Sequence, residues 1–144
     1  MNYLPLLGRF FYSFIFICAS FNHFTAQAVQ SAATQGAPLP ALLVPLSGLM
    51  SLAGGLSILL GFRAQLGAWL LIAFLIPVTL VMHNFWSISD PIMMQIQKMM
   101  FLKNMSMLGG AFIIAHFGSG PWSLDNVSNK FGFESDKIIT MEKE

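Results

Sequence analysis

Charged side chains are scarce in this sequence. Seven Lys and Arg and six Asp and Glu make up 9% of its 144 residues, against roughly 25% in ordinary soluble domains. A soluble chain of this length needs a polar surface, and so few polar residues cannot supply one. The net charge of +1 comes without any basic run or patch, which argues against nucleic acid as a partner.

Cysteine is nearly absent as well. Cys18 is the single cysteine and lies inside an apolar run, so the chain can form neither an internal disulfide nor a CxxC pair. A thiol in such a run is usually a small buried hydrophobe. A reactive thiol is the alternative.

Apolar residues, by contrast, are abundant: they make up 56% of the chain, and the mean hydropathy is +0.69. A membrane-crossing helix needs about 20 mostly apolar residues, and lipid tails can face such side chains directly. The sequence predicts an all-α membrane protein, an antiparallel bundle of four transmembrane helices. The expected spans are about 4–21, 41–60, 66–82 and 97–117, within a domain of residues 1–126 that is followed by a polar cytoplasmic tail, 127–144.

Two of the spans carry features that shape a helix. Pro77 is expected to kink the third span, because it removes the hydrogen bond to the Ala73 carbonyl. In the second span Ser47, Ser51 and Gly55 recur every four residues. Small residues at this spacing let two helices approach closely in lipid, so we predict a packing face there.

The first span has a competing interpretation. Arg9 lies near its start and can reach the nearer membrane surface with its long side chain. Alternatively, Arg9 ends the n-region of a secretory signal peptide that is cleaved near the A-x-A sequence of residues 26–28. The bulky aromatic run, followed by further apolar segments, favours a retained helix. In the uncharged connection 22–40, part of the stretch AQAVQSAA is expected to form a short surface helix.

The basic residues predict the orientation. With four spans both termini lie on one side, together with Arg9, Arg63 and the three lysines of the tail. Lys98 and Lys103 lie on the other side. Because basic residues favour the cytoplasmic side, we expect both termini in the cytoplasm.

This topology brings hydrogen-bonding side chains from three segments to one outer level. They end the first span, end the third and begin the fourth. The candidate ligand-binding residues among them are His23, His83, Asn84, Trp86, Lys103 and Asn104.

Several roles are open for these residues. Lys103 lies five residues beyond Lys98, roughly 7–8 Å deeper in the membrane at 1.5 Å per residue. It can extend its ammonium to the surface, bond within the bundle or contact a ligand. His23 and His83 are either interfacial residues or partners for the protons of a quinone headgroup. No acid or third ligand accompanies the histidines, so no metal site is predicted, and no catalytic residue can be named.

Five pieces of the chain carry a family resemblance: GRFFYSFIFICASFNHF, GGLSILLGFRAQLGAWLL, VTLVMHNFW, FLKNMSMLGGAFII and GSGPWSLDN. In their order and spacing, over about residues 5–126, the chain resembles the DoxX family of small four-helix membrane proteins, including its YphA-like members of the bacterial inner membrane. The chain has Ser51 and Asn84 where family members often carry acids. The two missing carboxylates weaken any proton or metal role taken from the family.

The resemblance implies a multi-pass inner-membrane protein that acts as a membrane subunit or as a small-molecule binder. Its partners would be the lipid bilayer and other proteins of a membrane complex. Since some relatives are subunits of a thiosulfate:quinone oxidoreductase, a quinone-linked subunit with quinone as cofactor is one alternative. A small transporter or channel component is another. Every Asp and Glu lies in a loop or the tail, so whether the protein is an enzyme stays open.

Overall fold

The computed structural model describes residues 3–128, and all regular structure in this part of the chain is helical. Four helical stretches are long and apolar enough to cross a membrane: Leu4–Phe24, Pro40–Leu60, Ala64–Ser87 and Pro91–Phe117. Their long helices are α1 (Leu4–Ser20), α3 (Pro40–Leu60), α4 (Ala64–Met82) and α5 (Pro91–Phe117). The short elements are η1 (Phe21–Phe24), α2 (Ala26–Thr34) and η2 (Phe85–Ser87). The all-helical class with four candidate spans is thereby confirmed.

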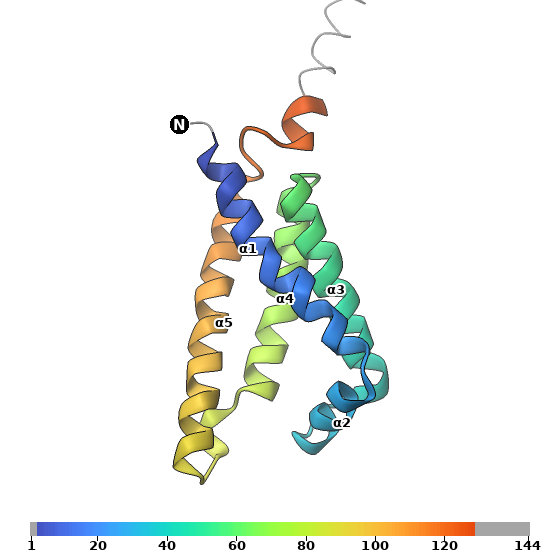
Figure 1. The fold of residues 1–144 in the computed structure, drawn as a ribbon, viewed down its shortest axis with the longest axis vertical. Coiled ribbons are helices and arrows are strands. Elements are labelled where there is room, and N and C mark those ends of the chain that lie inside the picture. Colours follow the sequence, from blue (N-terminus) through green and yellow to red (C-terminus); the bar gives the residue numbers. More distant parts are fainter. Residues whose placement is uncertain (1–2, 129–144) are drawn as a thin grey trace, which may run out of the picture.

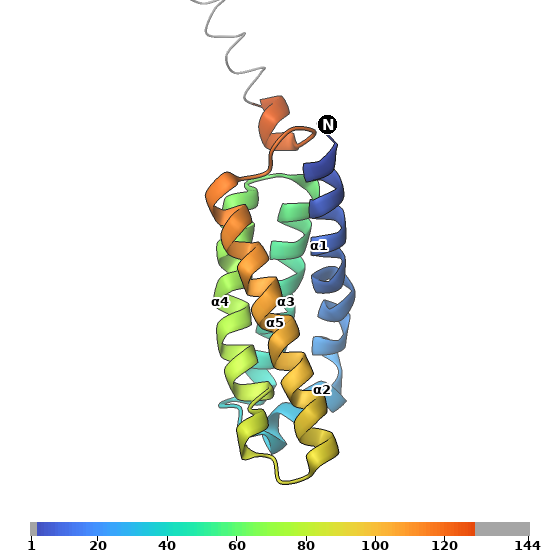
Figure 2. The ribbon, with the colours of Figure 1, turned by 90° about the vertical axis from the view of Figure 1, so that its left-hand side faces the viewer.

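The four long helices run lengthwise and alternate in direction (Figures 1 and 2). Along the chain, α1 packs against α3, α3 against α4, and α4 against α5. The start of α1, the turn at 61–63 and the segment 118–128 lie together at what we term the termini end (Figure 1). Elements η1, α2 and η2 lie at the opposite, distal end (Figure 1).

Helix α5 begins at Pro91, earlier than the predicted start at about residue 97. The Asp90 side chain accepts a hydrogen bond from the backbone N–H of Met93 at 2.7 Å, and proline suits the first helical position. Because of this cap, the helix begins several residues before the apolar run from which its start was predicted. The predicted short surface helix is confirmed as α2, where the Thr25 hydroxyl accepts from the Ala28 N–H at 3.2 Å.

Helix α4 runs without a break through Pro77, and a kink there stays a prediction. The predicted tail lies outside the described residues from position 129 onward.

Small residues of α3 hold the spans close together. A Cβ atom added at Gly55 would lie 3.0 Å from Ile17 of α1, and one added at Gly67 of α4 would lie 2.5 Å from the Ser57 hydroxyl. The buried Ser51 hydroxyl donates to the Phe16 carbonyl of α1 at 2.9 Å. The predicted small-residue face therefore packs within one chain, next to a core of Phe16, Ile58, Ala68, Leu71, Phe74 and Leu75.

Candidate ligand-binding site

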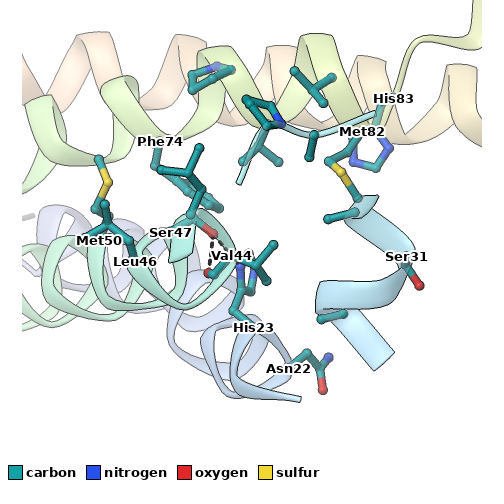
Figure 3. Close-up of a pocket in the computed structure, with 18 of the residues that line it drawn as sticks. Asn22, His23, Ser31, Val44, Leu46, Ser47, Met50, Phe74, Met82 and His83 are labelled. Atoms are coloured by element: carbon teal, nitrogen blue, oxygen red, sulfur yellow. Dashed lines mark hydrogen bonds between the residues drawn. The ribbon is translucent and has the colours of Figure 1, made fainter. Parts of the chain in front are cut away.

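A cavity of about 440 Å³ opens at the distal end between η1, α2, α3 and α4. Most of its 19 lining residues are apolar, and none is Lys, Arg, Asp or Glu. In Figure 3, His23 and Ser47 lie on one side of the cavity and Met82 and His83 on another. The sequence folds this way because Gly48 lets η1 approach α3: a Cβ atom there would lie 2.6 Å from the Cβ of His23.

The imidazole of His23 is held by α3. Its Nδ1 lies 2.8 Å from the Ser47 Oγ, and the Ser47 hydroxyl donates to the Val44 carbonyl at 2.7 Å. Its ring centroid is 5.8 Å from that of Phe74. This arrangement fixes the ring at the cavity wall, where it forms a polar point on an apolar surface.

The imidazole of His83 is held by α5. His83 caps the end of α4, and its Nδ1 lies 2.7 Å from the Gln97 Oε1. The bond joins the third and fourth spans at the level where the sequence placed the polar cluster. Both histidines are only partly buried, so each ring is anchored on one side and reachable on another.

Only some of the predicted site residues lie together in the structure. His23 and His83 line the same cavity, together with Asn22. The other four candidates do not line it: Asn84, Trp86, Lys103 and Asn104.

Those four residues lie on or near α5 in different surroundings. Trp86 is 59% exposed, and its ring centroid lies 5.9 Å from that of Phe101. The exposed Lys103 has its Nζ 3.3 Å from the Met100 sulfur, whereas Asn104 is buried. The predicted topology gives the level of each residue along the bundle. It does not show which of these side chains turn toward the cavity.

Comparison with known proteins places the chain in a family. The SURF4 family profile matches residues 43–131, more than half of the chain. The chain belongs to the SURF4 family. No solved structure matches it.

Two relatives of Escherichia coli K12 are similar over most of their length. The inner membrane protein YqjF is 27% identical over 125 residues, which cover 87% of this chain and 92% of YqjF. The inner membrane protein YphA is 29% identical over 124 residues, which cover 85% of this chain and 88% of YphA. With its four apolar helices, this SURF4-family chain is an integral inner-membrane protein. The finer resemblance to DoxX proteins stays an expectation.

A second polar cluster, which the sequence did not indicate, lies at the termini end of this SURF4-family protein. Arg9 is 3% exposed, and its Nη2 donates to the Trp122 carbonyl. Its Nε and Nη1 are buried without a hydrogen-bond partner among the described residues. The Arg9 side chain extends toward the termini end, where its acceptor comes from the segment after α5, 113 residues later in the chain; its reach to the membrane surface stays a prediction.

In the same cluster, side chains from elsewhere in the chain cap the ends of α4 and α5. The Asp125 carboxylate accepts hydrogen bonds from the N–H groups of Arg63 and Ala64 at 2.8 and 3.3 Å. In return, Gln65 donates from Nε2 to the carbonyls of Ala115 and His116 at 3.2 and 3.3 Å. These bonds satisfy backbone groups that helix ends leave open, so we assign the cluster a structural role.

Proposed function

We propose that this protein binds a small, largely apolar molecule in the distal cavity, with the polar group of the molecule beside His23 and His83. The observation that carries the proposal is the cavity itself. Its volume of about 440 Å³ falls in the range of small-molecule sites, roughly 300–1,000 Å³, and such sites pair apolar walls with few polar groups. Two anchored imidazoles on an apolar wall fit that description.

A membrane location supplies such ligands. Molecules that are mostly apolar partition into the bilayer, where the cavity between α2, α3 and α4 lies beside the ends of the spans. The apolar part of the ligand would contact side chains such as Leu43, Met50 and Val78. Because a ligand that arrives from the bilayer is already in apolar surroundings, close packing against these side chains, together with the polar contacts, must favour binding.

The test is photoaffinity labelling of the full chain in lipid nanodiscs with a decanol that carries an alkyl diazirine. We expect labelled peptides from α3 and α4 that contain cavity-lining residues. The variant Ala73→Trp fills the cavity from α4, so it should lose most of this labelling. The matched control Ala53→Trp adds the same side chain to an exposed position of α3 outside the cavity, and it should label like the original chain.

Equal labelling of these peptides in Ala73→Trp and in the original chain would contradict the proposal. The same preparations can be extracted with solvent and searched for bound lipids and quinones by mass spectrometry. A quinone that is retained by the original chain and lost in Ala73→Trp would select the quinone-linked alternative. Flux of a solute into proteoliposomes that Ala73→Trp abolishes would select the transporter alternative.

A further inference from the structure

We infer that the cavity selects a neutral ligand whose polar group donates a hydrogen bond, such as an aliphatic alcohol or a phenol. This inference rests on the proposed function and names the chemical class of its ligand. It follows from the directions of the hydrogen bonds around His23 and His83 and from the charges of the lining residues.

The hydrogen bonds of Ser47 set the tautomer of His23. A serine hydroxyl has a single hydrogen, and Ser47 donates it to the Val44 carbonyl at 2.7 Å. The Nδ1 of His23, 2.8 Å from the same oxygen, must therefore be the donor. In a neutral imidazole with its hydrogen on Nδ1, Nε2 carries a lone pair and accepts.

His83 has the same tautomer as His23, but a different hydrogen bond sets it. Its Nδ1 faces the Gln97 Oε1 at 2.7 Å, and an amide oxygen only accepts hydrogen bonds. With that oxygen as its partner, Nδ1 of His83 is also a donor, and in the neutral ring Nε2 is left as an acceptor. Among the described residues, Nε2 has no hydrogen-bond partner in either histidine.

The remaining polar groups of the cavity do not offset these two acceptors. Figure 3 shows Asn22 and Ser31 at the rim, with the Ser31 hydroxyl directed away from the cavity. The hydrogen of the Ser47 hydroxyl is already used by Val44. A ligand oxygen that can only accept would therefore face nitrogen lone pairs.

Charged headgroups are disfavoured by the same lining. With no Lys, Arg, Asp or Glu at the cavity wall, neither a carboxylate nor an ammonium finds an opposite charge. Moving an ion from water to a mostly apolar site without a partner is costly. The ligand class that remains is neutral and carries a hydrogen-bond donor such as a hydroxyl.

The test compares competitors that differ only in the headgroup. Decanol and its isomer methyl nonyl ether have the same atoms, but only decanol can donate. Each competes with the photoreactive decanol on the full chain in nanodiscs, as do decanoate and decylammonium, with all concentrations counted in the bilayer. We expect decanol to compete at a concentration lower than that of the ether by roughly fivefold or more, the effect of one neutral hydrogen bond. Both ions should compete more weakly than decanol.

Two variants trace this preference to its source. His23→Phe removes the acceptor but keeps a flat ring, and Ser47→Ala leaves the ring in place but frees its Nδ1. Each should reduce the preference for decanol over the ether and leave competition by the ether unchanged. The control Ser106→Ala alters an exposed serine of α5 outside the cavity and should keep the full preference.

The outcomes separate the two proposals. If decanol and the ether compete equally on the original chain, or if decanoate competes best, the inference about the donor is wrong and the proposed function stands. If neither molecule protects the cavity peptides, the proposed function fails. A decanol preference that survives both His23→Phe and Ser47→Ala would overturn the role given to His23.

Discussion

The carboxylate of Asp125 accepts a hydrogen bond from the backbone N–H of Arg63 at 2.8 Å, across 62 residues of chain. A second bond comes from the N–H of Ala64, the first residue of α4. No local side chain caps this helix. A negative charge at a helix N-terminus is also favoured by the helix dipole, so Asp125 serves α4 as its cap.

Asp125→Ala should lower the free energy of unfolding by about 1–2 kcal/mol, the usual effect of losing a cap. Denaturant titration in mixed micelles measures it. Asn126→Ala changes the neighbouring residue, whose side chain makes no hydrogen bond within the described part of the chain, and should have little effect. Equal stability of both variants would show that Asp125 does not cap α4.

Gly48→Ala is expected to destabilise the protein by about 1–3 kcal/mol, the range for overpacking. The added methyl group would lie 2.6 Å from the Cβ of His23 and 3.2 Å from the Ser20 carbonyl, so η1 must move away from α3. Thermal unfolding and the decanol competition should both respond. Gly109→Ala is the matched control, because nothing lies within 4 Å of its added Cβ, and it should gain about 0.5–1 kcal/mol. A Gly48→Ala protein as stable as this control would be inconsistent with the observed contact.

Tyr12→Phe tests the contact between α1 and α5. The Tyr12 hydroxyl donates to the Met107 carbonyl at 2.7 Å, and its ring lies against Gly110. Loss of this bond should cost about 1 kcal/mol, measured by unfolding in mixed micelles. Tyr3→Phe removes a hydroxyl from an exposed ring and should not change the stability. If the two variants behave alike, the bond contributes nothing.

The orientation of the bundle stays a prediction from its basic residues. In a Cys18→Ser background, Ser89→Cys at the distal end should react with a membrane-impermeant maleimide on intact cells. Ser128→Cys at the termini end should react only after the cells are permeabilised. The reverse result would invert the orientation, whereas labelling of both positions on intact cells would contradict four spans.

The sequence predicted the long helices well because each span is a continuous apolar run. Its main error, the late start of α5, came from weighing hydropathy above the cap at Asp90 and Pro91, although both residues are visible signals. The surface helix α2 was also predicted, and the packing face around Ser51 followed from the spacing of its small residues.

Contacts between residues far apart in the chain could not be predicted from the sequence. The acceptor of Arg9 could not be predicted, because nothing nearby in the chain indicates that the Trp122 carbonyl will supply it. The shared level of His23 and His83 followed from the topology, but their anchors, Ser47 and Gln97, depend on how the helices are rotated. The same rotation leaves Lys103 outside the cavity.

The cap on α4 has a consequence for biosynthesis. A chain grows from its N-terminus, so residues 64–82 leave the ribosome well before Asp125 has been added. Until then the first turn of α4 has open N–H groups, and water or translocation machinery must satisfy them. Completion of this helix is therefore among the last steps of assembly. A nascent chain that stops directly after α5 lacks the Asp125 carboxylate, which caps α4.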